Sequence, residues 1–304
     1  MLKKLSKSIM LKLHNFRDKL LQILDWFIST NINIRIGIIA ASMIFIVSII
    51  GFSLHYINKN RNINLNKKIV QKYKHHSSNV QNSHYPAHML SEFYKLYDTN
   101  HDIKGWLSIP NTVINYPVVQ STDNDYYLHN NFNKTADPYG SLFLDYRNNI
   151  SPQSQNMIIY GHNMKDGQML TSIVNYQQTD FYKTSPVITF NTIYGHCSWK
   201  VFAAFITNAD PKDGYVFNYL VTNFPSDDTF NSFIKEVRAR SLINTPSIDV
   251  VPGDNILTLS TCYYSSNNAR FVVMARKVRP HESTAVEPAT RNENALSPMR
   301  SMDK

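Results

Sequence analysis

The stretch Ile256-Leu-Thr-Leu-Ser-Thr-Cys262 alternates apolar and polar residues with a period of two. This alternation is typical of a β-strand that covers a core with one face. We expect its two leucines to point to the core, whereas Thr258, Ser260 and Cys262 point to the opposite face. The pattern therefore predicts a strand that ends with a cysteine on its polar side.

Seven further short runs of β-favouring residues lie between residues 106 and 278, separated by Pro, Gly, Asn or Asp. They are Trp106–Ile109, Val113–Gln120, Ser141–Leu144, Asn156–Tyr160, Val187–Asn191, Lys200–Thr207 and Phe271–Val278. Eight short strands with few helices predict a mainly β fold, closed or nearly closed into a barrel, rather than an alternating βα fold.

Two helices are expected beside these strands. Residues 88–98 have an apolar face at helical spacing. Ser226 is a plausible N-cap, with two aspartates in the first turn and two arginines near residue 240, which suits the helix dipole. This second helix is inserted before the strand that ends at Cys262.

Composition and charge exclude several classes of protein. The chain has 304 residues, of which 43% are hydrophobic, so a wholly disordered chain is excluded and one main domain with attachments is expected. Lys and Arg outnumber Asp and Glu by 13 to 2 in residues 1–87, but the counts are 15 to 16 in residues 88–279 and 3 to 4 in residues 280–304. Because the basic excess lies outside the expected fold, we predict no nucleic-acid partner. Two cysteines exclude a disulfide scaffold.

An uncharged run from Ile36 to Ile57 predicts a membrane-spanning helix. Its 22 residues would span about 33 Å as a helix, which matches a bilayer core. A cleaved signal peptide would be shorter, closer to the start and followed by small residues. Seven basic residues precede the run and six follow it closely, so charge alone does not decide its orientation.

The remaining attachments complete a five-part organisation. Residues 1–35 form a basic amphipathic segment, which either lies on an anionic membrane surface or packs on a neighbouring helix. We expect the transmembrane helix at 36–57, a polar linker at 58–87, the folded domain at 88–279 and a disordered tail at 280–304. The tail contains no second apolar anchor.

The chemistry depends on what lies near Cys262. A cysteine nucleophile reacts as its thiolate, which a nearby histidine or cation favours. Arg270 opens the next strand eight residues later and approaches Cys262 if the two strands are neighbours. The alternative is a buried, inert cysteine and a surface arginine.

Two copies of Tyr-Gly-His supply candidate histidines. His162 follows an apolar strand, where reactive groups are commonly displayed, whereas His196 and the adjacent Cys197 fit a hairpin turn. The residues alone leave the pairing of His162 with Cys262 open.

Together these residues resemble a known family. Thr258-Leu-Ser-Thr-Cys262, Tyr160-Gly-His-Asn163 and an arginine that opens the final strand resemble the sortases, which are membrane-anchored cysteine transpeptidases. The insertion helix near 226–241, the helix near 88–98 and the segment Gly140-Ser-Leu-Phe-Leu-Asp-Tyr-Arg147 look like the class B branch.

The resemblance implies an eight-stranded β-barrel and a role for individual residues. Cys262 matches the nucleophile, His162 the general acid/base and Arg270 the stabilising cation. Four residues resemble positions that line the groove for the sorting signal: Asn124, Leu128, Ser260 and, less closely, Tyr215. The resemblance implies no metal and no cofactor.

The resemblance also implies a reaction and its partners. The enzyme would cleave a C-terminal sorting signal resembling Asn-Pro-x-Thr-x after the threonine and transfer the surface protein, through a thioacyl-enzyme, to an amine of a peptidoglycan precursor or cross-bridge. The N-terminus would lie inside the cell, the N-terminal helix in lipid and the catalytic domain outside. A pilin-polymerising sortase, a cysteine protease that uses water and an inactive module that only binds the signal remain alternatives.

Overall fold

The computed structural model describes residues 2–74, 84–264 and 268–298 and divides the chain into two units, Met1–Asn60 and Arg61–Lys304. The first unit contains α1 (Leu2–Ser29) and most of α2 (Ile32–Lys74), which continues into the second unit. Among the described residues, α2 is the one helix long and apolar enough to cross a membrane.

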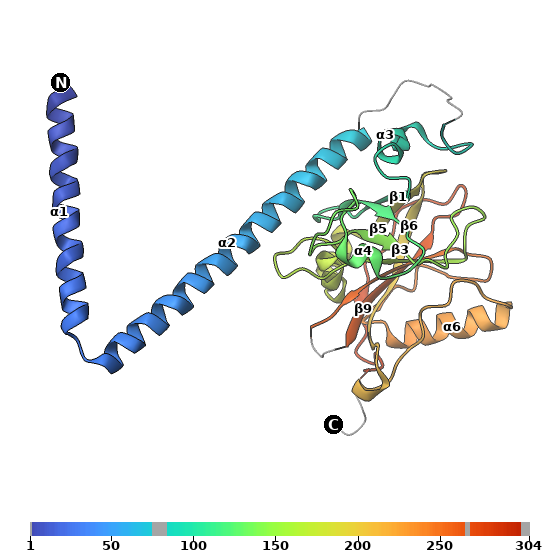
Figure 1. Cartoon of the computed structure of the whole chain (residues 1–304). Coiled ribbons are helices and arrows are strands. Elements are labelled where there is room, and N and C mark those ends of the chain that lie inside the picture. Colours follow the sequence, from blue (N-terminus) through green and yellow to red (C-terminus); the bar gives the residue numbers. More distant parts are fainter. Residues whose placement is uncertain (1, 75–83, 265–267, 299–304) are drawn as a thin grey trace. The chain divides into compact units, whose positions relative to one another are not determined.

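The second unit is built around a closed barrel of eight strands, as the sequence predicts (Figure 1). Its order around the barrel is β1-β2-β3-β4-β8-β9-β6-β5. Two neighbouring pairs, β2–β3 and β4–β8, are parallel, and the other six are antiparallel. The strands are β1 (Ile103–Ser108), β2 (Asn115–Val119), β3 (Leu142–Leu144), β4 (Asn156–Tyr160), β5 (Val187–Thr192), β6 (Ser198–Asn208), β8 (Ile256–Cys262) and β9 (Ala269–Lys277).

The predicted alternation along β8 is confirmed. Leu257 and Leu259 are buried in the barrel interior. On the opposite face, Thr258 and Ser260 are also buried, because a second apolar cluster covers the outside of this strand. The strand is therefore buried on both faces except at its last residue, Cys262.

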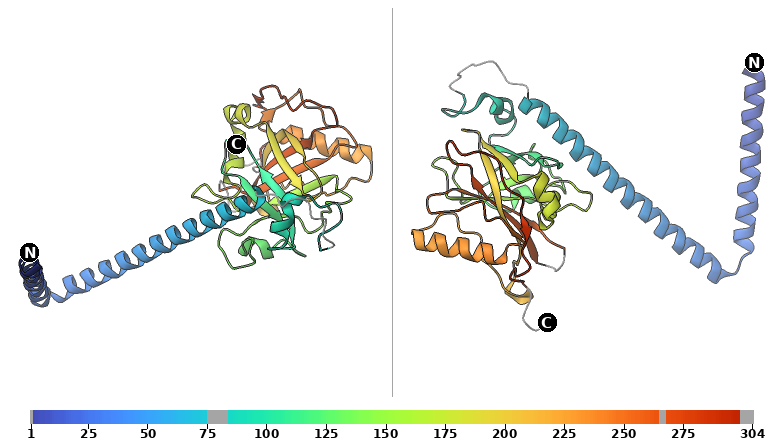
Figure 2. Two further views of the ribbon diagram at one scale, coloured as in Figure 1. Left: turned by 90° about the horizontal axis from the view of Figure 1, so that it is seen from above. Right: turned by 180° about the vertical axis from the view of Figure 1, so that it is seen from behind.

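The predicted insertion helix is α6 (Asp227–Arg240), which lies on the outside of the barrel (Figures 1 and 2). Ser226 is its N-cap and forms a capping box with Thr229. Its apolar face packs on Phe202 of β6 and Met274 of β9. The shorter elements are η1 (Ser91–Phe93) and α3 (Tyr94–Tyr97), both inside the helix expected at 88–98, and α4 (Tyr126–His129), η2 (Thr171–Gln177), α5 (Thr179–Thr184), η3 (Pro211–Asp213), β7 (Ile243–Asn244) and β10 (Thr290–Arg291).

The expected polar linker at 58–87 differs from the structure over residues 58–74, which are helical. The side chains of Asn62 and Ile69 are buried, and Leu65 and Tyr73 pack on the same apolar cluster as Ile69. These residues recur at helical spacing, but Asn62 and Asn66 interrupt the apolar stripe, so no amphipathic period is apparent in the sequence. Residues 75–83 lie outside the described residues.

The expected disordered tail at 280–304 also differs from the structure, because residues 280–298 return to the barrel. β10 pairs with β7, and Glu282 contacts two cations of the sheet, Arg276 and Lys200. Arg276 is buried in β9, and a buried guanidinium requires a carboxylate partner. This ion pair, together with the packing of Val286 and Ala289 on the core, orders the segment. Residues 299–304 lie outside the described residues.

We predict that Glu282→Gln lowers the free energy of unfolding by about 3 kcal/mol at pH 7, because the buried Arg276 charge then keeps only the more distant carboxylate of Asp249, at 3.8 Å. Hydrogen bonds from Arg276 and Lys200 hold the pKa of Glu282 well below its usual range, against the opposing effect of burial. The stabilisation is therefore present above the unfolded pKa of about 4.3 and is lost as the pH falls through the lower folded pKa.

The measurement is thermal unfolding of the full chain in detergent at pH 7 and at pH 3. The matched control is Glu287→Gln, since Glu287 is exposed. A Glu282→Gln variant that unfolds like this control at pH 7 would show that the tail adds no stability.

Candidate active site

Cys262 and Arg270 lie opposite each other on two neighbouring strands. The antiparallel register of β8 and β9 pairs them directly. Residues paired in this way carry their side chains on the same face, with Cβ atoms about 4.5–5.5 Å apart. The two strands are therefore neighbours, which is the condition for Arg270 to approach Cys262, and Cys262 is exposed rather than buried.

The guanidinium of Arg270 makes no ion pair within the described ranges. Its Nη1 donates to the backbone carbonyls of Ala269 at 3.2 Å and Asn268 at 3.5 Å. Because a guanidinium has five N–H donors, several remain for an oxygen atom close to Cys262.

His162 reaches the same end of the barrel from β4. The parallel register pairs Tyr160 with Ser260, so His162, two residues further on, lies level with Cys262. Two hydrogen bonds extend this pairing beyond the strands: Thr261 Oγ1 donates to the Gly161 carbonyl at 2.7 Å, and Asn163 Nδ2 donates to the Cys262 carbonyl at 2.8 Å. The sulfur, the imidazole and the guanidinium thus come from three adjacent chain segments.

The orientation of the His162 ring is set by Leu128. His162 Nε2 lies 2.8 Å from the Leu128 carbonyl oxygen. Because a carbonyl only accepts, Nε2 must carry the proton, and Nδ1 of the neutral ring is free to accept one. Gly140 lies against this carbonyl with φ of +57°, and a Cβ there would be 2.7 Å from the Leu128 oxygen. Leu128, a predicted groove residue, therefore contacts His162 through its backbone.

Asn124, another predicted groove residue, belongs to a polar network that includes Tyr160, two residues before His162. Its side chain donates to Asp145 at 3.1 Å and accepts from the Tyr146 amide at 3.0 Å. Asp145 is fully buried and also accepts from the hydroxyl of Tyr160 at 2.8 Å. Arg147 donates to Asp145 through two nitrogens, at 2.9 and 2.8 Å.

The charge of Asp145 is stabilised inside this network. Burial alone would raise the pKa of Asp145, but hydrogen bonds from Arg147 and Tyr160 outweigh it and hold the pKa below its usual value. Burial and the Asp145 charge raise the pKa of Tyr160, so its hydroxyl stays protonated and donates. The network therefore fixes Tyr160, two residues before His162.

Ser260 is covered by a residue that the sequence analysis did not identify, Tyr219. The hydroxyl groups of Tyr219 and Ser260 are 2.8 Å apart, and Ser260 is only 1% exposed. Burial raises the pKa of Tyr219, while the hydrogen bond with Ser260 and the charge of Arg270 act in the opposite direction. Tyr219 thus lies beside the proposed site, but its segment has no periodic pattern in the sequence that would have indicated this.

Tyr215, the remaining groove candidate, is not brought together with the other site residues. It is 54% exposed, and its ring lies 4.7 Å from the guanidinium carbon of Arg240 in α6. None of its hydrogen bonds or ring contacts in the described chain involves Cys262, His162 or Arg270.

The second Tyr-Gly-His segment forms the turn between β5 and β6, as predicted. Thr192 and Gly195 form a bridge there, and His196 pairs with Glu92 at 3.3 Å. Cys197 is half-buried. Across the described residues, no group of three or more His, Cys, Asp or Glu side chains is arranged to hold a metal ion.

Comparisons with known proteins show which proteins this chain is similar to. The family model described as Sortase domain matches residues 107–278. Sortase B of Staphylococcus aureus is 32% identical over 246 residues, which cover 80% of this chain and 96% of that protein. Sortase B of Listeria monocytogenes is 35% identical over 213 residues, which cover 70% and 82% respectively. The solved Staphylococcus aureus sortase B–substrate complex has a TM-score of 0.64 at 32% identity and covers 73% of this chain and 99% of its own.

We predict that iodoacetamide modifies Cys262 at least about tenfold faster than Cys197 at pH 7, because Cys262 is exposed next to Arg270 whereas Cys197 is half-buried, and reactive cysteines lie in accessible, electropositive surroundings. The rates are measured by mass spectrometry on the single-thiol variants Cys197→Ala and Cys262→Ala. Equal rates would contradict the exposed position of Cys262.

Proposed function

The chain belongs to the sortase family, in its class B branch, and is thus a cysteine transpeptidase that acts on sorting signals; from this premise we propose its substrate, acceptor and catalytic residues. The substrate is a surface protein with a C-terminal signal resembling Asn-Pro-x-Thr-x, cleaved after the threonine. The acceptor is an amine of a peptidoglycan precursor or cross-bridge. The observation that carries the proposal is the register that pairs Cys262 with Arg270 and sets His162 level with them.

The first half of the reaction forms a thioacyl-enzyme. The Cys262 thiol passes its proton to His162 Nδ1, the resulting thiolate attacks the threonine carbonyl carbon, and the carbon–nitrogen bond to the next residue breaks. Arg270 donates hydrogen bonds to the oxygen on which negative charge develops. His162 gives a proton to the departing amine through Nδ1, since Nε2 is engaged by Leu128.

The second half transfers the acyl group to the acceptor. His162 takes a proton from the incoming amine, whose nitrogen attacks the thioester carbonyl and releases the Cys262 thiolate. The product is an amide between the surface protein and the acceptor. The Cys262 thiolate takes this proton back from His162 Nδ1, so both residues return to their starting protonation states and no cofactor is consumed.

We propose that the sorting signal of the substrate binds beside Cys262, His162 and Arg270. Leu128 supplies an apolar side chain next to His162, and Asn124 holds the loop that carries it. Ser260 acts through the Tyr219 hydroxyl, which covers it. Tyr215 stays a candidate for the distal part of the signal, supported only by its exposed ring.

We also propose that α2 anchors the enzyme in the cell membrane, with the N-terminus inside and the catalytic domain outside. Most apolar side chains from Ile36 to Ile57 are uncovered, for example Phe52 at 73% exposure. Contiguous exposed apolar surface on this scale is stable in lipid rather than in water. α1 carries the basic residues that suit an anionic lipid surface.

We predict that Cys262→Ala abolishes both cleavage and transfer, while Cys197→Ala retains wild-type activity. The full chain in detergent is incubated with a library of sorting-signal peptides, with and without an amine acceptor, and the products are identified by mass spectrometry. Cleavage by Cys262→Ala would exclude the mechanism. If the peptide is cleaved but the amine is never incorporated, the enzyme is a protease. If a pilin lysine, supplied as a second acceptor, is the only amine incorporated, the enzyme is a pilin polymerase.

We predict that Arg270→Lys lowers kcat by about 10²-fold or more, because an ammonium does not reproduce the planar donor geometry at the developing oxyanion. Arg291→Lys is the matched control, since Arg291 is exposed. Initial rates on the best peptide check this, and unchanged kcat in Arg270→Lys would remove Arg270 from the mechanism.

A further inference from the structure

The C-terminal part of α2, residues 61–74, packs on the barrel and is here called the docked segment. Tyr73 stacks on Trp106 of β1 with 4.3 Å between ring centroids and 2° between ring planes, and its hydroxyl accepts from Asn191 Nδ2 at 3.1 Å. Lys72 Nζ donates to Thr99 at 2.8 Å. These contacts hold one end of the segment.

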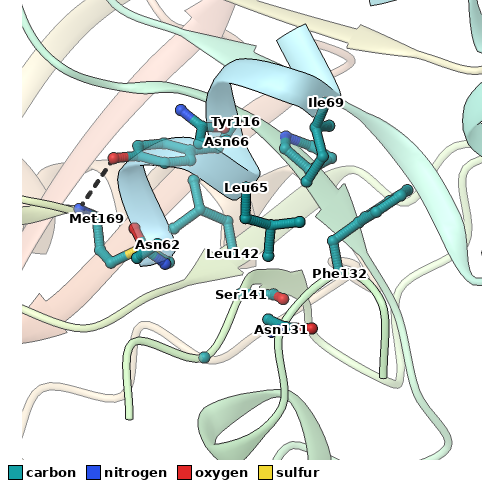
Figure 3. Close-up of a pocket in the computed structure, with 12 residues that line it drawn as sticks. Asn62, Leu65, Asn66, Ile69, Tyr116, Asn131, Phe132, Ser141, Leu142 and Met169 are labelled. Atoms are coloured by element: carbon teal, nitrogen blue, oxygen red, sulfur yellow. Dashed lines mark hydrogen bonds between the residues drawn. The ribbon is translucent and has the colours of Figure 1, made fainter. Parts of the chain in front are cut away.

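At its other end, the docked segment closes a small cavity of about 30 Å³ (Figure 3). Asn62, Leu65, Asn66 and Ile69 line one side. The other side includes Tyr116, Gly140, Ser141, Leu142 and Met169. The Oδ1 atoms of Asn62 and Asn66 are buried and accept no hydrogen bond from the described residues. Unpaired buried acceptors weaken an interface, so adhesion alone does not explain these residues.

One wall of the cavity leads to His162 through Met169. The Met169 amide donates to the Tyr116 hydroxyl at 3.4 Å, as Figure 3 shows. Met169 also forms a bridge with Asn163, and the Leu170 amide donates to the His162 carbonyl at 3.0 Å. Met169 has φ of +59°, a conformation that a non-glycine residue keeps only when its surroundings impose it.

The other wall leads to the His162 ring through Gly140 and Ser141. The Ser141 amide donates to the Tyr127 carbonyl at 2.9 Å, and Gly140 lies against the carbonyl of Leu128. That Leu128 oxygen is the partner of His162 Nε2. The docked segment therefore packs on residues next to two groups that hold His162. One is the Met169–Leu170 backbone, which bonds to the His162 carbonyl, and the other is the Leu128 carbonyl, which contacts the His162 ring.

We propose that the docked segment is a positioning element for His162, with Leu65 and Ile69 as its positioning residues. The inference rests on the proposed role of His162 in proton transfer. When the segment is undocked, both walls lose their cover, and the imidazole is no longer held level with Cys262. Displacements of this kind slow the chemical steps more than they weaken substrate binding.

The test uses the full chain in detergent with the variant Ile69→Asp, which inserts a charge into the docked face. Hydrogen exchange read by mass spectrometry should show lost protection in residues 61–74. We expect kcat to fall by about tenfold or more, because displacing a reacting group by 1 Å can cost about 10²-fold, while the KM for the peptide stays within about twofold.

Three further variants complete the design. Gln71→Asp inserts the same charge on the exposed face of the helix and should behave like the wild type, as should the conservative Ile69→Val. Leu65→Ala is a milder change, which enlarges the cavity without adding a charge. It replaces Ile69→Asp if that variant does not fold. Thermal unfolding and iodoacetamide labelling of Cys262 check the folding of both variants. For Leu65→Ala we expect a smaller fall in kcat at unchanged KM.

Two results would overturn the inference. One is lost protection of residues 61–74 with unchanged kcat in Ile69→Asp or Leu65→Ala. The other is a rise in KM without a fall in kcat, which would assign the segment to substrate binding. Failure of the proposed function is distinguishable, because in that case the wild type itself cleaves no peptide of the library.

Discussion

The site depends on one constraint, the parallel pairing of β4 with β8. β8 is also the antiparallel partner of β9, so it brings together three chain segments, two of which are about 100 residues apart. The register pairs Tyr160 with Ser260 and Cys262 with Arg270. A slip of one residue would turn every side chain of β8 to the opposite face. The thiol would then point into the barrel, away from His162.

Apolar packing prevents β8 from shifting by one residue against β4 and β9, because its leucines would leave the core. It does not prevent a shift of two residues, because the apolar and polar residues of β8 alternate with a period of two. Polar contacts make that distinction. Thr258 donates to Asn156 at 2.7 Å, Thr261 donates to the Gly161 carbonyl, and Asn163 donates to the Cys262 carbonyl. A slip of two residues would break all three hydrogen bonds and leave buried groups unpaired, at a cost of about 1–3 kcal/mol each. The threonines of this strand therefore fix the position of the cysteine that ends it.

The sequence predicts what is encoded locally. The eight strands, the Ser226 cap of α6 and the turn at His196 each follow from periodicity or turn chemistry within a few residues. The short connection between the strands of Cys262 and Arg270 allowed the two residues to be close but did not decide it. By contrast, the β4–β8 pairing joins distant segments, and only the resemblance to sortases indicated that His162 would reach Cys262. The covering of Ser260 by Tyr219 and the burial of Asp145 depend on irregular segments. Their apolar residues do not recur at helix or strand spacing, so the sequence does not predict these contacts.

The two misassigned segments have a common feature, because in each of them polar residues interrupt the apolar contacts with the barrel. The docked face of α2 contains Asn62 and Asn66 among its apolar residues, and the tail is held through the Glu282 carboxylate. Neither has the continuous apolar stripe by which a packed element is recognised. Polar contacts of this kind add little net adhesion but require a particular geometry. Such segments therefore suit a role in fixing positions on the barrel, and the structural domain extends beyond residues 88–279 on both sides.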